Sequence, residues 1–110
     1  MKIIKNSLEG IKVAAEILKD NGVVAFPTET VYGLGANACS KEAVTKVYTI
    51  KKRPSFNPLI IHVSSYEMAK EYGVFNDLAK KLTQKYWPGP LTIIVEKKKS
   101  DIVEAATASL

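Results

Sequence analysis

Residues 23–35 read Val-Val-Ala-Phe-Pro-Thr-Glu-Thr-Val-Tyr-Gly-Leu-Gly. The apolar run before Pro27 is short and lies between a glycine and a proline, which is typical of a buried strand. After it come two threonine hydroxyls, a carboxylate and a phenol, and Gly33 and Gly35 allow a positive φ or close approach of a ligand. Ligands often bind beyond strand ends in α/β sheets, so we expect a ligand-binding loop over residues 28–37. An ordinary polar turn is the competing interpretation.

Two capped helices flank this stretch. Ser7 can accept a hydrogen bond from a free N–H of the first turn, which predicts a helix over residues 8–20. Gly22 is expected as its left-handed cap. Ser40 caps a second helix, and Pro54 limits it because the residue before a proline avoids the helical region. The second helix should place these apolar residues on one face: Ala43, Val47 and Ile50.

The remaining segments continue the alternation of strands and helices. Further strands are predicted at residues 1–5, 59–63 and 91–95. Further helices are predicted at residues 66–72 and at residues 76–87, the latter capped by Asn76, and residues 100–106 predict one or two helical turns. This order of elements is typical of an α/β fold.

The bulk properties indicate one ordinary globular domain over residues 1–110. Hydrophobic residues make up 46% and charged residues 25% of the chain. The single cysteine excludes an internal disulfide and favours a reducing cytoplasm, and no apolar stretch is long enough to span a membrane. The net charge of +5 favours anionic partners such as nucleotides or RNA, although the lysines at 97–99 are typical of a solvated surface.

Basic side chains cluster near the end of the second helix. Lys46, Lys51 and Arg53 are suited to binding phosphate, although positive charge at a helix C-terminus also has a simple dipole explanation. Pro54 and Pro58 then stiffen a turn that leads into the next predicted strand. A rigid turn that carries two cations can orient a triphosphate.

Taken together, these segments closely resemble the YrdC/Sua5 family. The resemblance runs from about residue 11 to residue 95 and implies a YrdC-like α/β fold, with a twisted mixed sheet and flanking helices. It also implies that the chain is the N-terminal portion of a longer domain, incomplete at its C-terminus. The motifs that carry it are residues 28–35, Lys46-Val47-Tyr48, Lys51-Lys52-Arg53-Pro54, Asn57-Pro58-Leu59-Ile60-Ile61-His62-Val63 and Trp87-Pro88-Gly89-Pro90-Leu91-Thr92.

The resemblance implies a nucleotidyltransferase that uses ATP and Mg²⁺. L-threonine and bicarbonate give an N-carboxylated amino acid, which attacks the α-phosphate of ATP. Pyrophosphate leaves, and threonylcarbamoyl-AMP forms. In the family, a partner enzyme then transfers the threonylcarbamoyl group to adenosine 37 of certain tRNAs, so tRNA and tRNA-modification proteins are expected partners. Whether this chain is active alone is left open.

The resemblance also assigns roles to individual residues. It implies that Lys51 and Arg53 are the catalytic pair, contacting phosphates and carboxyl groups, where they would stabilise the charge of the transition state. No metal site built from side chains is expected, because one His and one Cys are too few. The implied threonine-side residues are Thr28, Thr30, Tyr32 and His62, and the implied ATP-binding residues are Lys46, Lys51, Arg53 and Asn57.

Two alternatives from other classes stay open. The first is a basic RNA-binding module that keeps the fold without the chemistry. The second is a carbamoyl-adenylate-forming relative from hydrogenase maturation, which the single cysteine disfavours because those modules accompany cysteine-rich zinc-finger-like segments. His62 also has a simpler interpretation, since a lone histidine in an apolar strand is commonly a hydrogen-bonded core residue.

Overall fold

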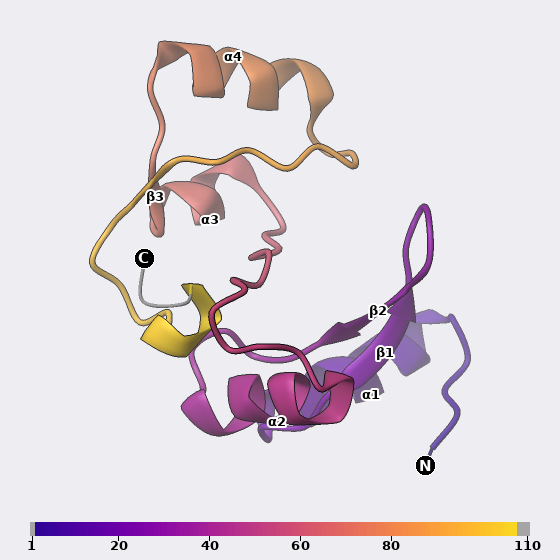
Figure 1. Cartoon of the computed structure of the whole chain (residues 1–110). Helices are drawn as coiled ribbons and strands as arrows, with labels where there is room; N and C mark the ends of the chain where they lie inside the picture. The colour runs from indigo at the N-terminus through magenta and orange to yellow at the C-terminus, as the bar shows by residue number, and fades with distance from the viewer. Residues whose placement is uncertain (1, 108–110) are drawn as a thin grey trace. The chain divides into compact units, whose positions relative to one another are not determined.

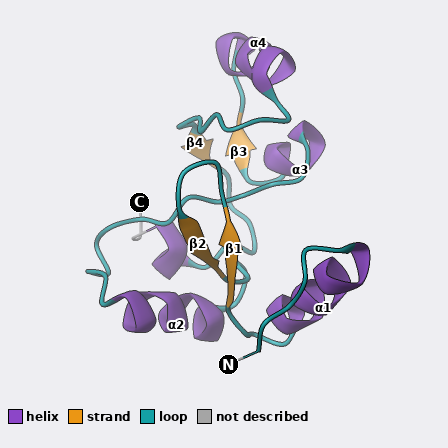
Figure 2. Ribbon diagram, turned by 90° about the vertical axis from the view of Figure 1, so that its right-hand side faces the viewer, coloured by secondary structure: helices purple, strands orange, loops and turns teal. Residues whose placement is uncertain are grey.

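The computed structural model describes residues 2–107, which form two compact units (Figures 1 and 2). The first unit consists of residues 2–59 and 103–107, and the second of residues 60–102. Each unit contains both helices and strands, so the predicted α/β class is confirmed. Within the described part, no helix is long and apolar enough to cross a membrane. The single domain over residues 1–110 stays a prediction.

Helix α1 (Leu8–Lys19) begins at the predicted cap. The Ser7 hydroxyl accepts a first-turn backbone N–H at 3.1 Å. The left-handed residue after the helix is Asn21, with φ of 64°, so the prediction of Gly22 at this position was wrong. The Gly22 N–H donates to the Ile17 carbonyl at 2.8 Å, as in a Schellman motif. Asparagine can take the left-handed position because its short polar side chain lowers the cost.

The predicted ligand loop is largely a β-hairpin. Strand β1 (Val24–Pro27) confirms the predicted strand within one residue and pairs antiparallel with β2 (Tyr32–Gly35). The expected loop over residues 28–37 is therefore wrong for β2, and no described glycine has a positive φ. Gly35 has a packing reason instead: a Cβ there would lie 2.6 Å from the Phe26 ring. Because glycine has no side chain, the two glycines of β2 leave no alternation of polar and apolar residues by which the sequence could show a strand.

Helix α2 (Lys41–Lys51) carries the core of the first unit. The Ser40 hydroxyl accepts a backbone N–H at 3.2 Å, which confirms the predicted cap. Ile50, predicted on the same face as Ala43 and Val47, is 57% exposed at the end of the helix. The helix packs against the 3₁₀ turn η1 (Glu104–Thr107), which is drawn in yellow in Figure 1. This turn accounts for the helical turn predicted near the end of the chain. Its Ala106 is buried. The buried residues of α2 are Ala43, Val44, Val47 and Tyr48.

Helix α2 ends at a lysine in the left-handed conformation. Lys52 has φ of 52° and ψ of 38°. Its N–H donates to the Thr49 carbonyl at 3.3 Å, and the Arg53 N–H donates to the Tyr48 carbonyl at 3.0 Å. Both bonds satisfy carbonyls of the last turn, again as in a Schellman motif. For a residue with a Cβ, this conformation costs roughly 1–2 kcal/mol.

Lys52→Gly is therefore expected to raise the free energy of unfolding by about 1 kcal/mol, because glycine takes the left-handed conformation without steric cost. Lys51→Gly is the matched control, since it removes the same charge inside the helix, where glycine costs about 1 kcal/mol. Urea denaturation followed by circular dichroism measures both changes. A Lys52→Gly chain less stable than the wild type would contradict this explanation.

The second unit contains the other two helices and a short ladder. Helices α3 (Tyr66–Lys70) and α4 (Asp77–Tyr86) confirm the helices predicted there, and the Asn76 side chain caps α4 by accepting a backbone N–H at 2.9 Å. Strand β3 (Gly73–Val74) pairs antiparallel with β4 (Glu96–Lys97) (Figure 2). Aromatic rings fill the space beside them: Phe75 lies 5.3 Å from Tyr66 and 6.3 Å from Trp87 between ring centroids.

Three predicted strands are not strands in the structure. Described residues 2–5, 59–63 and 91–95 form no ladder, and residue 1 lies outside the described part. The last two segments still alternate between half-buried and exposed residues, as an extended chain does; Ile60 is 63% and Ile94 is 97% exposed. These two segments are extended, but a strand also needs a backbone partner. In the described part, both ladders are antiparallel, so the predicted mixed pairing does not form.

Candidate functional site

The turn of the β1–β2 hairpin, residues 28–31, is held by Thr28. The Thr28 hydroxyl oxygen accepts the backbone N–H groups of Thr30 and Val31, each at 3.2 Å, and the hydroxyl donates to the Val31 carbonyl. The hydroxyl oxygens of Thr28 and Thr30 lie 3.4 Å apart. This hairpin turn is exposed, and Tyr32, directly after it, is 74% exposed. The predicted threonine-side residues of this unit are thus gathered on one exposed turn.

Thr28→Val is expected to loosen the hairpin turn at a cost of about 1 kcal/mol, because valine keeps the shape but removes the hydrogen-bonding hydroxyl. Thr28→Ser is the matched control, since it retains the oxygen. Amide hydrogen exchange at Thr30 and Val31 should accelerate in the valine variant and stay near wild type in the serine variant. Equal exchange rates in both variants would show that the hydroxyl does not hold the turn.

The second candidate element is the basic turn, residues 51–58. Arg53 Nη2 donates to the Pro58 carbonyl at 3.1 Å, and the Asn57 N–H donates to the Pro54 carbonyl at 3.0 Å. From inside α2, the Tyr48 hydroxyl lies 2.6 Å from the Asn57 carbonyl and 3.1 Å from that of Ala105. These contacts, together with the two prolines, give the turn a defined shape.

The cations of the basic turn have no carboxylate partner in the described part. The ion pairs found there involve Lys19 and Lys46, whereas Lys51 and Arg53 are exposed. The Pro58 carbonyl takes one N–H of the guanidinium, and a guanidinium has five. Lys51 and Arg53 can therefore receive an anion without first breaking an ion pair. Asn57 is half-buried in the same turn.

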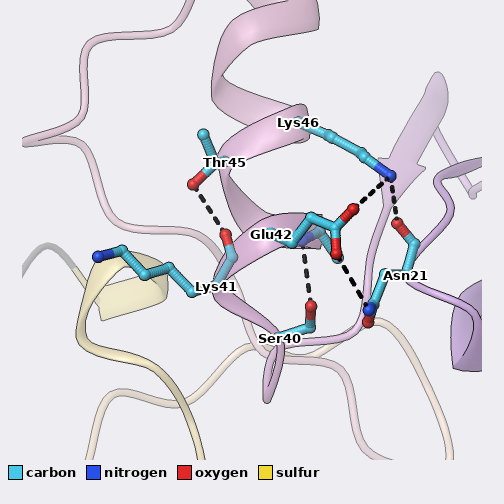
Figure 3. A network of polar contacts seen from close by, with 7 residues as sticks. Asn21, Ser40, Lys41, Glu42, Thr45 and Lys46 are labelled. Carbon is cyan, nitrogen blue, oxygen red and sulfur yellow. Dashed lines mark hydrogen bonds and ion pairs between the residues drawn. The ribbon is translucent and has the colours of Figure 1, made fainter.

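Lys46, the other predicted ATP-binding residue, is already engaged (Figure 3). Its Nζ donates to the Asn21 carbonyl at 2.8 Å and lies 3.5 Å from a carboxylate oxygen of Glu42. Its contact with ATP stays a prediction. Glu42 and Lys46 are four residues apart on a helix, a spacing that favours an ion pair and that is visible in the sequence. The contact with Asn21 joins residues distant in sequence and had no such signal.

His62 belongs to the second unit, whereas the hairpin turn and the basic turn belong to the first. It is exposed, as Ile60 is, so the interpretation of His62 as a core residue is wrong. His62 Nδ1 lies 3.2 Å from the Ile60 carbonyl oxygen. The role of His62 in binding the amino acid stays a prediction.

Within the first unit, the structure provides two separate polar elements. Among its described residues, no hydrogen bond or ion pair links the hairpin turn to the basic turn. Each turn is closed by its own contacts, and each keeps exposed groups for a ligand. In the described part, no group of three or more His, Cys, Asp or Glu side chains is placed to hold a metal ion.

The fold and these two turns define an α/β chain of Sua5-like architecture. It superposes on the crystal structure of Pyrococcus abyssi Sua5 complexed with L-threonine with a TM-score of 0.89 and 39% identity, over 96% of this chain and 31% of that one. A substituted form of the same protein gives a TM-score of 0.90. The family model described as Telomere recombination, which covers Sua5, YciO and YrdC proteins, matches residues 16–110. The chain belongs to this family, as the sequence motifs predicted.

Curated relatives agree with this assignment. The chain is 48% identical over 101 residues to the threonylcarbamoyl-AMP synthase of Bacillus subtilis, which covers 91% of this chain and 29% of that protein. It is 47% identical over 91 residues to the enzyme of the same name from Pyrococcus abyssi, covering 79% of this chain and 26% of that protein. The chain thus spans about a quarter to a third of the length of these relatives.

Proposed function

We propose that this chain is part of a threonylcarbamoyl-AMP synthase, which converts L-threonine, bicarbonate and ATP into threonylcarbamoyl-AMP and pyrophosphate for tRNA modification in the cytoplasm. The observation that carries the proposal is the basic turn: Arg53 and Lys51 stand exposed and without carboxylate partners on a segment closed by its own hydrogen bonds. Membership of the family and the threonine-bound relative support the choice of substrates.

In the proposed reaction no side chain of the protein forms a covalent bond with the substrate. The threonine amine and bicarbonate give a carbamate and water, and a carbamate oxygen forms a bond to the α-phosphorus of ATP. The bond from that phosphorus to the bridging oxygen breaks, and pyrophosphate leaves. Negative charge grows on the phosphate oxygens, where Lys51 and Arg53 would stabilise it. ATP enters with its Mg²⁺ as part of the substrate, and phosphates together with water can supply most of the metal's ligands.

The hairpin turn is the proposed threonine side of the site. Thr30 and Tyr32 present exposed hydroxyl groups, which can bind the polar groups of an amino acid. Thr28, the residue that the resemblance assigns to threonine binding, uses its hydroxyl to shape the turn. Asn57 is proposed to bind ATP. His62 is proposed to bind the amino acid, on the ground of the resemblance alone.

A binding experiment tests the proposal on the full-length protein that contains this chain. ATP at about 100 times its dissociation constant stabilises a folded chain by about 2.7 kcal/mol. The melting temperature should therefore rise clearly with ATP, and further when L-threonine and bicarbonate are added. Mass spectrometry of the same mixture should detect threonylcarbamoyl-AMP. L-valine, which has the shape of threonine without its hydroxyl, is the control and should add nothing.

The same experiment separates the proposal from an RNA-binding module. That alternative predicts salt-sensitive binding to RNA and no response to threonine. A full-length protein containing this chain that shows no change of melting temperature with ATP and threonine, and that makes no product, would refute the proposed function.

A further inference from the structure

A ring of polar contacts joins helix α2 to the turn that ends helix α1 (Figure 3). Lys46 Nζ donates to the Asn21 carbonyl at 2.8 Å and pairs with Glu42 at 3.5 Å. The ring is closed by Asn21 Nδ2, which donates to Glu42 Oε2 at 3.3 Å. We call Asn21, Glu42 and Lys46 the clamp.

The clamp joins the two segments that lead to the elements of the proposed site. Asn21 is the left-handed residue from which the chain leads into β1 and the hairpin turn. Lys46 lies five residues before Lys51 on the same helix, about 7.5 Å along its axis. Because a helix is stiff, fixing α2 at its first two turns also fixes the position of its last turn, from which Lys51 projects and the chain leads to Arg53.

The charges around Lys46 argue against a direct phosphate contact. Its ammonium group has three donors, and it already serves the Asn21 carbonyl and the Glu42 carboxylate. A phosphate bound at Lys46 would meet the negative charge of Glu42 as well. Lys51 and Arg53 have no such carboxylate beside them in the described part.

We infer that Lys46 is a positioning residue: the clamp holds α2 to the start of the hairpin and sets the direction of the basic turn, while Lys46 itself does not touch ATP. This inference rests on the proposed function. The side chains of Lys46 and Glu42 are 43% and 65% exposed, and an exposed ion pair adds little stability. Breaking the clamp is therefore expected to change the stability of the fold only slightly.

The test compares Glu42→Gln, Lys46→Met and the double variant, with Lys41→Met as matched control on the same helix. ATP affinity is measured by calorimetry well below the unfolding temperature, and stability by urea denaturation. Both single variants should bind ATP about tenfold more weakly with nearly unchanged stability, which a merely structural role would not produce. The double variant should be no worse than either single variant, because all three break one ring. Lys41→Met should bind as the wild type does.

Glu42→Gln decides between positioning and phosphate contact. If Lys46 contacts phosphate, removing the nearby negative charge should leave ATP binding unchanged or tighter, and that result would overturn the inference. Losses that multiply in the double variant would also overturn it.

A measurement without ligand separates this inference from the proposed function. The NMR amide signals of Lys52 and Arg53 should move in Glu42→Gln and in Lys46→Met, and stay in place in Lys41→Met. If the full-length wild-type protein binds no ATP, the proposed function fails, and the clamp is then tested by these signals alone. Unmoved signals would show that it does not position the basic turn.

Discussion

Arg53→Gln is expected to lower the affinity for ATP roughly 10- to 100-fold, since hydrogen bonds to charged groups contribute about 1.5–3 kcal/mol. The guanidinium is exposed, lies in a turn that it helps to close, and has no carboxylate partner among the described residues. Calorimetric titration with ATP measures the change. The rate of threonylcarbamoyl-AMP formation should fall at least as far, because charge on the phosphate grows in the transition state.

Two further variants sharpen this prediction. Lys52→Gln removes the neighbouring positive charge and should change ATP affinity much less than Arg53→Gln. Arg53→Lys keeps the charge but loses the planar fork, and one ammonium is a poor substitute for a guanidinium that serves the Pro58 carbonyl and a phosphate together. It should therefore bind ATP more weakly than the wild type. Equal losses for Arg53→Gln and Lys52→Gln would reduce the role of Arg53 to that of a general surface charge.

Val44→Asp is expected to have the largest effect on stability. Val44 is 1% exposed, on the face of α2 that forms the core of the first unit. A carboxylate in that position would be buried without a partner, and we expect a loss of about 4 kcal/mol or more. Urea denaturation followed by circular dichroism measures it, and the variant should be partly unfolded even in buffer.

Thr45→Asp is the matched control for the buried charge. Thr45 is the next residue, is exposed, and makes one hydrogen bond to the Lys41 carbonyl at 2.8 Å. The same charge there should change the free energy of unfolding by only about 0.5 kcal/mol. If the two aspartate variants unfold at the same urea concentration, the core assigned to α2 is wrong.

Helix starts were predictable because their signals are local. Ser7, Ser40 and Asn76 each satisfy a backbone N–H three residues later, so the cap and the group it serves lie within one short segment. The helix ends were harder. A left-handed residue closes both α1 and α2, yet the residues there are Asn21 and Lys52 and neither is glycine.

The chemical content of the candidate site could also be predicted from the sequence. The hydroxyls of the hairpin turn lie within a few residues of one another in the sequence, and so do the cations of the basic turn. A sequence motif shows such local groups directly. The engagement of Lys46 could not be predicted in the same way, because its acceptor is the carbonyl of Asn21, which lies far away in sequence, in the connection between α1 and β1.

The sequence by itself determined the helices, the side chains that cap the starts of three of them, and the family of this protein, because each depends on residues within a few positions or on motifs read in order. Only the tertiary structure decided which extended segments became strands: residues 32–35 found a partner in β1, while residues 59–63 and 91–95 formed no ladder. Likewise, it decided that the Tyr48 hydroxyl meets the carbonyls of Asn57 and Ala105. The reason is that backbone pairing and buried hydrogen bonds need two segments to meet in space, and a pattern within one segment specifies only one of the two.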